Sequence, residues 1–327
     1  AGDIFENNAV DRLSIQKTAD LLAKALMPVY LIPGNHDPLL PGSIWEHPSW
    51  QESRNVHILK ENAPLGIPGG ILFPCPVCQK DSRKDPTAWI SAGTGGEIRI
   101  GMAHGTVERG FQEEVDHPIP RNAAVRSGLD YLALGHWHST AKYSGPDGAV
   151  RMAYSGTPEP TAFGERDSGN VLIVEIERPG AAPKIETVTT GGLDWRAMER
   201  QVRTSADLTA LRREIESIEN PSAVLLNIAL SGLMAPDDRT ELERIVEIVS
   251  SRFLYGAVDT SRLRPSPDDD RWVESLPPGI IRQAGEKLRQ MTDPGFGGPR
   301  PEGVTPEVAS RALIELFALI SEAGVRR

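Results

Sequence analysis

Short apolar runs in the first half of the chain each end in a group of Gly, Asn, His or Asp residues. The runs are residues 29–32, 98–103 and 131–134, followed respectively by 33–37 (Pro-Gly-Asn-His-Asp), His104 and 135–138 (Gly-His-Trp-His). Runs of this length between turn-forming residues predict buried strands with polar side chains at their carboxyl ends. A further strand is expected over residues 171–176.

A helical pattern precedes the first of these runs. Its apolar positions are Val10, Leu13, Leu21, Leu22 and Leu26, and Pro28 ends it. This order of elements predicts an α/β fold, in which ligands bind in the crevice outside the carboxyl ends of the strands. The Asn, His and Asp residues gather at that edge, so we expect the functional site there.

The spacing changes after residue 185 and predicts a separate small α/β domain over residues 190–262. Ser205 can cap a helix with apolar positions at helical spacing, namely Leu208, Leu211, Ile215 and Ile218. A strand follows, with alternating apolar residues Val224, Leu226, Ile228 and Leu230. Residues 242–253 then return to helical spacing.

Segments 264–270 and 292–303 are rich in Pro, Gly and Asp, which predicts linkers. Thr305 and Pro306 open a terminal helix over residues 306–323 that has little polar surface. We expect this helix to dock on a partner, and packing on its own domain is the alternative. The predicted organisation is therefore a first domain over 1–185, a small α/β domain over 190–262, and a linker with a C-terminal helical segment over 263–327.

The composition is typical of a soluble globular protein. Of the 327 residues, 39% are hydrophobic and 24% are charged, and no stretch approaches the ~18 apolar residues of a membrane span. Residues 1–8 lack the features of a secretory signal. The cysteines Cys75 and Cys78 are too few for a disulfide framework. We therefore expect a cytoplasmic protein without a membrane partner.

The formal net charge of −10 argues against a surface that grips nucleic acid by itself, since such affinity comes mainly from Lys and Arg. A DNA contact would have to be local, or a partner would have to supply it. An acidic balance also suits a protein that gathers divalent cations in one cleft, although a solvated acidic surface is the commoner explanation.

The polar groups at the strand ends suggest metal and phosphate chemistry. Asn35 offers a neutral oxygen ligand, His36 an acid or a ligand, and Asp37 a group that can orient an imidazole. His136 and His138 lie two residues apart, so in an extended backbone both rings point the same way. Taken singly, each group has an ordinary alternative: a polar turn, or a satisfied buried histidine in the case of His104.

Their succession resembles the calcineurin-like metallophosphoesterase superfamily. The residues that carry this resemblance are Gly2-Asp3, Gly34-Asn35-His36-Asp37, His104 and Gly135-His136-Trp137-His138. Residues 154–159, 163–165 and the strand at 170–175 are similar to the SbcD branch of DNA-repair nucleases. The likeness covers residues 1–176, and residues 191–261 resemble that branch's small capping domain in element order only. Glu159 and Glu165 could equally be surface loop carboxylates.

The resemblance implies a two-sheet metallophosphoesterase sandwich flanked by helices, with a small capping domain and a C-terminal helical tail. It implies that Asp3 bridges two metal ions, that Asn35, His104 and His136 hold one of them, and that His138 holds the other. It further implies that His36 faces the substrate phosphate and that Asp37 supports its protonation and orientation. Two divalent ions, with manganese favoured, would activate a hydroxide for in-line displacement.

The sequence departs from that family at its beginning. The family's first motif, Asp-x-His, does not precede Gly2-Asp3 in this chain. We expect that pair in a piece upstream of Ala1, since without it the metal held by His138 would lack ligands.

These observations favour a manganese-dependent DNA nuclease that works with an SMC-like ATPase, with a homodimer as a further expected assembly. The alternatives are a small-molecule or nucleotide phosphodiesterase or phosphatase, and a non-catalytic scaffold of the ATPase complex. Cys75 and Cys78 could form half of a zinc site, but no second pair exists, so metal binding is disfavoured there. Surface or packing roles are favoured for His47, His57 and His117.

Overall fold

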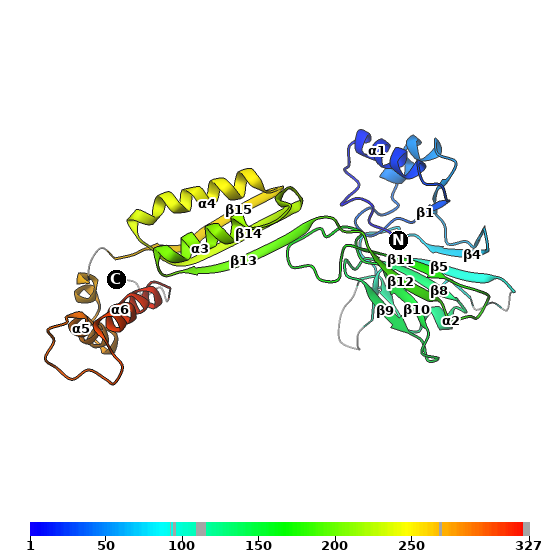
Figure 1. Cartoon of the computed structure of the whole chain (residues 1–327). Helices are drawn as coiled ribbons and strands as arrows, with labels where there is room; N and C mark the ends of the chain where they lie inside the picture. The colour runs from blue at the N-terminus through cyan, green and yellow to red at the C-terminus, as the bar shows by residue number, and fades with distance from the viewer. Residues whose placement is uncertain (92, 94–95, 109–115, 268–269, 323–327) are drawn as a thin grey trace. The chain divides into compact units, whose positions relative to one another are not determined.

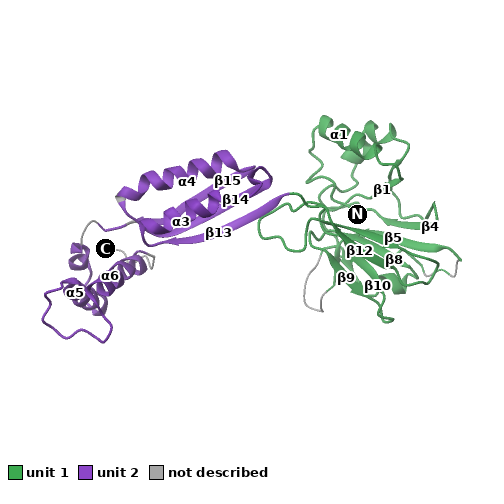
Figure 2. Cartoon of the chain, in the orientation of Figure 1, with its two compact units in different colours: residues 1–192 green, residues 193–327 purple. Residues whose placement is uncertain are grey.

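The computed structural model describes residues 1–91, 93, 96–108, 116–267 and 270–322. These residues form two compact units, 1–192 and 193–327, which are coloured separately in Figure 2. The division lies just beyond the expected boundary at 185–190, whereas the expected segments 190–262 and 263–327 fall in one unit. Linker residues 268–269 and Ala323 of the expected terminal helix lie outside the described residues.

Unit 1 begins with a small helical layer. Helix α1 (Arg12–Ala23) starts at Asp11, whose Oδ1 accepts a hydrogen bond from the backbone N–H of Ser14 at 2.9 Å. It packs near the parallel strands β1 (Val29–Leu31) and β2 (Val56–Ile58). The 3-10 helices η1 (Ile44–Glu46) and η2 (Pro48–Gln51) complete this layer. Its core holds the buried side chains Ile15, Ala19, Leu31, Ile44, Trp45, Trp50 and Val56.

In the described part of unit 1, the largest sheet has six strands in the order β3-β4-β5-β8-β10-β9. In this order, their bounds are Leu65–Ile67, Gly70–Cys75, Ile98–His104, Tyr131–Gly135, Val150–Tyr154 and Ala141–Ser144. Strands β4, β5, β8 and β10 run parallel, and β3 and β9 are antiparallel edges. The carboxyl ends of β5, β8 and β10 therefore lie at one edge (Figure 1).

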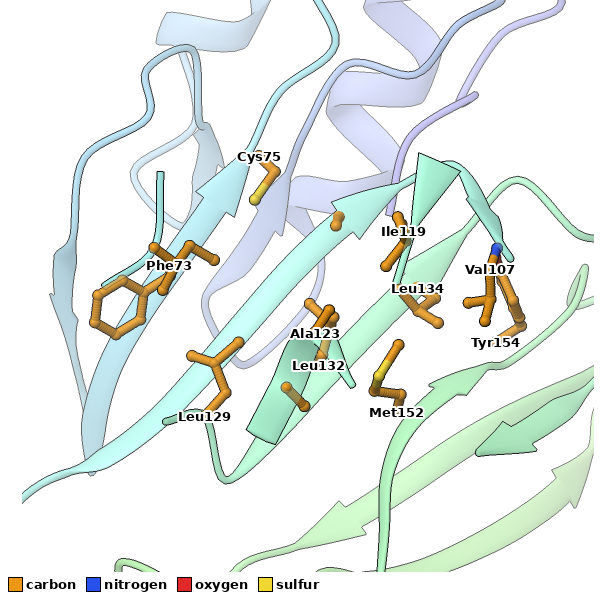
Figure 3. Close-up of a cluster of buried hydrophobic side chains, with 13 residues drawn as sticks. Phe73, Cys75, Val107, Ile119, Ala123, Leu129, Leu132, Leu134, Met152 and Tyr154 are labelled. Atoms are coloured by element: carbon orange, nitrogen blue, oxygen red, sulfur yellow. The ribbon is translucent and has the colours of Figure 1, made fainter. Parts of the chain in front are cut away.

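A second core of unit 1 lies against the six-stranded sheet, where α2 (Ala123–Arg126) contributes Ala123 (Figure 3) and also Ala124. Strands β6 (Thr106–Val107) and β7 (Pro118–Ile119) form a short parallel pair beside it. The buried Tyr154 hydroxyl accepts a hydrogen bond from the Val107 N–H at 2.9 Å and donates to the carbonyl of Gly105 at 2.5 Å. Tyr154 thereby fixes the chain that leaves β5 just after His104.

Strands β11 (Asn170–Glu175) and β12 (Lys184–Thr189) form an antiparallel pair that follows the main sheet in sequence. Residues 155–169 connect β10 to β11. The backbone of this connection is tied to residues beyond β8, because the N–H of Thr157 donates to the carbonyl of His138 at 3.0 Å and the N–H of Thr140 donates to Asp167 at 2.8 Å.

Unit 2 contains a three-stranded parallel sheet in its described residues, in the order β13-β14-β15. The strands are Asp194–Val202, Val224–Met234 and Tyr255–Pro265, and the elements between them are α3 (Ser205–Glu216), η3 (Pro221–Ala223), η4 (Pro236–Asp238) and α4 (Arg239–Arg252). Alternate residues of β14 are buried against the two helices. Thr204 rather than Ser205 caps α3, and the carboxylate of Asp207 accepts from the Thr204 N–H at 2.8 Å.

The last elements are η5 (Arg271–Ser275), α5 (Ile280–Thr292) and α6 (Pro306–Glu322). Helices α5 and α6 pack together, and the ring of Phe317 on α6 meets that of Trp272 at 5.0 Å. The α6 helix therefore covers part of its own unit, as the alternative expectation had it, while Val308, Ile314 and Leu319 remain exposed.

The α/β class predicted from the sequence is confirmed, with several sheets in place of two continuous ones. The expected strands at residues 29–32, 98–103, 131–134 and 171–176 correspond to β1, β5, β8 and β11. Helix α5 and strands β13 and β15 were not predicted, and β15 occupies the start of the expected 264–270 linker. Among the residues that the structure describes, no helix is long and apolar enough to cross a membrane.

Candidate metal centre

Two neighbouring parallel strands bring His104 and His136 together. His104 is the last residue of β5, and it pairs in register with Gly135, the last residue of β8. His136 therefore leaves β8 directly beside His104, and their rings lie edge to face with centroids 5.1 Å apart. Asn35 reaches the same point from the loop after β1, and Asp3 from the start of the chain.

These four side chains form a compact group, which we call the ligand cluster. The Nε2 atom of His104 lies 2.8 Å from Oδ1 of Asn35 and 3.1 Å from Oδ2 of Asp3. The Nδ1 atom of His136 lies 3.1 Å from the same Asn35 oxygen and 3.3 Å from Nε2 of His104. The ligand atoms of Asp3, His104 and His136 all lie within 4.8 Å of one another.

The Nδ1 atom of His104 carries a proton, because it lies 2.8 Å from the carbonyl oxygen of Ala1, which can only accept. In the neutral ring Nε2 then has a lone pair. That lone pair faces a carboxylate oxygen and an amide oxygen, and the ring is fully buried. Acceptor atoms that converge in this way repel one another unless a cation lies among them, so the donor set fits a divalent metal ion.

The other ring of the cluster is also suited to bind as a neutral ligand. Burial lowers the pKa of His136 to about 4, and the neighbouring His104 contributes to the same shift as the second-largest cause. The carboxyl of Asp3 also has a lowered pKa: burial raises it, but the interactions with His104 and the backbone N–H of His36 outweigh that effect. Both groups are thus in the form that metal binding requires.

The backbone at this cluster is strained and tightly packed. Asp3 and His136 have positive φ angles of 53° and 113°, a backbone region that residues other than glycine rarely adopt. A Cβ atom at Gly34 would overlap the carboxylate of Asp3, and one at Gly135 would overlap the carbonyl oxygen of Ala1. Glycine at these positions lets three chain segments meet closely enough for the ligand cluster to form.

Asp37 accepts hydrogen bonds from the backbone of two loops. Its carboxylate is fully buried and accepts hydrogen bonds from the backbone N–H groups of Ile4 at 2.7 Å, Phe5 at 3.0 Å and Gly34 at 2.7 Å. These hydrogen bonds join the Asp3 loop to the Asn35 loop. The support of His36 by Asp37 stays a prediction.

His36 lies on the outer side of the same loop. Its backbone N–H donates to Oδ1 of Asp3 at 2.9 Å, which helps to hold the Asp3 carboxylate. Its side chain is 44% exposed, and Nδ1 lies 3.2 Å from the carbonyl oxygen and 3.4 Å from the carboxylate of Glu6. The ring is therefore separate from the ligand cluster and open to solvent. Its role toward a substrate phosphate stays a prediction.

His138 is not part of the ligand cluster in the described residues. Its Nδ1 lies 2.7 Å from Oε1 of Glu165 and 3.2 Å from the hydroxyl of Thr161. Burial raises the pKa of the Glu165 carboxyl, but hydrogen bonds from Thr161 and His138 lower it to about 2. Glu165 is thus a partly buried partner of His138.

Asp3, His136 and His138 line one cavity of about 550 Å³. The connection between β10 and β11 also lines this cavity and contributes Thr157, Glu159 and Thr161. The carboxylate of Glu159 accepts from the backbone N–H of Gly192, at 2.9 Å to the nearer oxygen. Residues 155–161 therefore form a polar wall close to the two histidines of the segment 135–138.

The remaining histidines and the cysteines have local partners. His47 caps η2 by accepting from the Ser49 N–H at 3.3 Å, and His57 stacks on Tyr30 at 5.1 Å. His117 is buried, with Nε2 3.3 Å from the Lys80 carbonyl oxygen and 3.6 Å from the Asp116 carboxylate. Cys75 is buried, with its thiol 3.4 Å from the Trp89 indole nitrogen, whereas Cys78 is exposed.

Comparison with known proteins agrees with this geometry. Residues 1–140 match the family Calcineurin-like phosphoesterase. The chain is also similar to the uncharacterized metallophosphoesterase YhaO of Bacillus subtilis (strain 168), with 25% identity over 247 residues. That alignment covers 71% of this chain, and the chain spans 59% of the relative's length. The two findings support the calcineurin-like metallophosphoesterase superfamily, whose members generally bind two divalent metals and hydrolyse phosphoester bonds, for the unit that contains the ligand cluster.

Proposed function

We propose that this protein is a metal-dependent DNA nuclease of the SbcD type, which hydrolyses phosphodiester bonds together with an SMC-like ATPase. The observation that carries the proposal is the ligand cluster, in which one carboxylate, one amide oxygen and two imidazole nitrogens converge at the carboxyl ends of neighbouring strands. This donor set lacks thiolate and suits manganese, iron or zinc, and we favour manganese from the family resemblance.

The residues divide into those that would bind the metal ions and one that would face the substrate. Asp3, Asn35, His104 and His136 would hold one ion, and Asp3 and His138 would serve a second. A bound pair of divalent ions supplies Lewis-acid chemistry at a phosphodiester, by lowering the pKa of a water and neutralising developing charge. His36 would meet the substrate phosphate, because its exposed ring adjoins Asp3 without occupying the cluster.

DNA is favoured over a small phosphodiester by the segment next to the cavity. Residues 154–165 resemble the nuclease branch, and part of this segment, within residues 155–161, lines the cavity beside His138. A second unit follows, for which a small-molecule phosphodiesterase has no need. The net charge of −10 means that non-specific grip on DNA would be weak, which agrees with a nuclease that depends on a partner for DNA affinity.

The helices α5 and α6 are the proposed contact for the ATPase. They pack on each other, yet Ile280 is 84% and Leu319 60% exposed, and Val308 and Ile314 are also exposed. Large apolar side chains on paired helices fit the apolar surface of a coiled coil. Replacing Ile280 and Leu319 with Ser should weaken co-purification with the ATPase and leave metal binding unchanged. Equal recovery of the ATPase by this variant would refute the contact.

Cleavage assays test the nuclease itself. The full chain would be incubated with linear plasmid DNA, bis-p-nitrophenyl phosphate or cyclic nucleotides, each with and without MnCl₂. We expect manganese-dependent DNA degradation that His104→Ala abolishes and Glu177→Gln, a change at an exposed carboxylate, does not. Turnover of nucleotides without DNA cleavage would instead support a small-molecule phosphodiesterase. If no substrate is cut while the ATPase still binds, the scaffold alternative is favoured.

A further inference from the structure

The side chain of His138 has a single strong partner in the described structure, and that partner is a carboxylate. Oε1 of Glu165 lies 2.7 Å from Nδ1 of the ring. The carboxylate is 13% exposed, whereas the ring is 58% exposed and lines the cavity beside Asp3 and His136. The contact joins residues that are 27 positions apart, so the fold and not local sequence brings them together.

Glu165 is itself held in a fixed orientation. Its Oε2 accepts from the backbone N–H of Thr161 at 2.9 Å, and its Oε1 accepts from the Thr161 hydroxyl at 2.7 Å. Both oxygens are therefore engaged, and the carboxylate has little freedom to follow a rotating ring. A preorganised acceptor of this kind selects one orientation and one tautomer of the histidine that it binds.

The backbone around His138 is held by the same connection that supplies Glu165. The carbonyl of His138 accepts from the N–H of Thr157, and the N–H of Thr140 donates to the carbonyl of Asp167. The chain approaches closely here, since a Cβ atom at Gly156 would lie within 2.5 Å of the His138 carbonyl oxygen. Residues 156–167 thus form hydrogen bonds both with the backbone around His138 and with its ring.

His104 provides a matching arrangement inside the ligand cluster. Its Nδ1 proton goes to a protein oxygen, the carbonyl of Ala1, and its Nε2 lone pair is thereby available to a metal. His138 has the same pattern, with Glu165 in place of the carbonyl. We propose that Glu165 is the positioning residue of the second metal site, which fixes His138 with the proton on Nδ1 and leaves Nε2 as the metal-binding atom.

The proposal deepens the proposed function and rests on it in one respect, namely that His138 serves a metal ion. Its structural half concerns the tautomer of one ring and can be measured without metal or substrate. In ¹⁵N-labelled full chain at a pH where the ring is neutral, the nitrogen shifts of His138 report which atom carries the proton. We expect the Nδ1–H form in the unaltered protein, and loss of that preference in Glu165→Ala.

A conservative variant separates positioning from mere folding. Glu165→Gln keeps an acceptor oxygen for the ring, so it should restore most of the Nδ1–H preference that Glu165→Ala loses. Glu177→Ala removes an exposed carboxylate of the same unit and should change nothing. A His138 ring that keeps the Nδ1–H form in Glu165→Ala, with amide signals outside residues 155–170 unchanged, would overturn the proposal.

The effect on metal binding is tested by calorimetric titration with MnCl₂ of protein that includes the expected upstream Asp-x-His pair. Removal of a residue that orients a ligand histidine typically costs 10- to 100-fold in affinity, so Glu165→Ala should weaken the second manganese by about 10- to 100-fold and Glu165→Gln by less. The first manganese, in the ligand cluster, should bind as before. Unchanged affinity for both ions would overturn this half. Absence of DNA cleavage with the tautomer result intact would count against the nuclease function alone.

Discussion

The Nε2 atom of His104 and the Oδ1 atom of Asn35 lie 2.8 Å apart in the buried ligand cluster. Nδ1 of the ring donates to the Ala1 carbonyl, so in the neutral ring Nε2 has no proton to share with the amide oxygen. Two lone pairs at this separation are unfavourable in a buried site unless a cation joins them. With His104 neutral, the arrangement therefore fits a bound cation better than a hydrogen-bonded network.

Removal of His136 should weaken metal binding at the ligand cluster. The site already relies on the neutral amide oxygen of Asn35, a weak donor, and His136→Ala would leave an open position beside it. We expect manganese affinity to fall by at least ~10-fold in a calorimetric titration. His57→Ala, which removes an imidazole stacked on Tyr30, is the matched control. Unchanged stoichiometry and affinity would remove His136 from the ligands.

Much of this cluster was predictable from sequence, for a simple geometric reason. Parallel strands end at the same edge of a sheet, so polar residues placed directly after β5 and β8 must meet there. His104 pairs with Gly135 in the sheet, so the next residue, His136, must lie beside His104. Prediction from sequence worked here because the strand ends are marked by abrupt changes from apolar to polar residues.

Other contacts could not be predicted because no local pattern encodes them. Glu165 lies in a polar connection whose composition is that of any surface loop, and only the fold brings it to His138. Asp37 is adjacent to His36 in sequence, yet two of its three partners are backbone N–H groups more than 30 positions away. Strands β13 and β15 contain many charged residues, since one face of their sheet is not covered by helices α3 and α4.

Substitution at Gly135 should disturb both stability and metal binding. An alanine Cβ there would overlap the Ala1 carbonyl oxygen that holds His104, so one chain segment must move away. Such overpacking typically costs about 1–3 kcal/mol of unfolding free energy. Urea denaturation and manganese titration of Gly135→Ala measure the two effects. Gly66→Ala is the control, because a Cβ at Gly66 meets open space, and a loss of equal size in both variants would contradict the explanation.

Asp37→Asn should destabilise unit 1 although the two side chains have nearly the same shape. The carboxylate accepts at both oxygens, from Gly34 at one and from Ile4 and Phe5 at the other. An amide has one oxygen only, so its NH₂ group would face a backbone donor on one side. A buried donor left without an acceptor costs about 1–3 kcal/mol.

Thermal or urea unfolding of the metal-free variant measures the effect of Asp37→Asn directly. Hydrogen exchange should also become faster at the amides of Ile4 and Phe5, since their acceptor is lost or weakened. Asp11→Asn, which alters the exposed cap of α1, provides a comparison with a smaller expected loss. If Asp37→Asn were as stable as the unaltered protein, the carboxylate would not be the tie between the two loops.

His36→Ala should separate catalysis from metal binding. The ring lies outside the ligand cluster and contacts Glu6, while its backbone N–H, which the substitution retains, donates to Asp3. The variant should therefore keep its metal affinity. If the ring acts as an acid or stabilises charge on the substrate phosphate, turnover should fall ~10²- to 10⁴-fold. Manganese titration and DNA cleavage on the same preparation test both statements.

A second variant shows whether the effect of His36→Ala belongs to the imidazole or to the loop that carries it. Glu6→Gln removes the carboxylate 3.4 Å from the ring but leaves the Glu6 carbonyl, which lies 3.2 Å from Nδ1. Because that carbonyl still accepts from the ring, Glu6→Gln should retain most of the activity. Loss of metal in His36→Ala would instead mean that the ring binds a metal ion, and the roles of His36 and a cluster histidine would have to be exchanged.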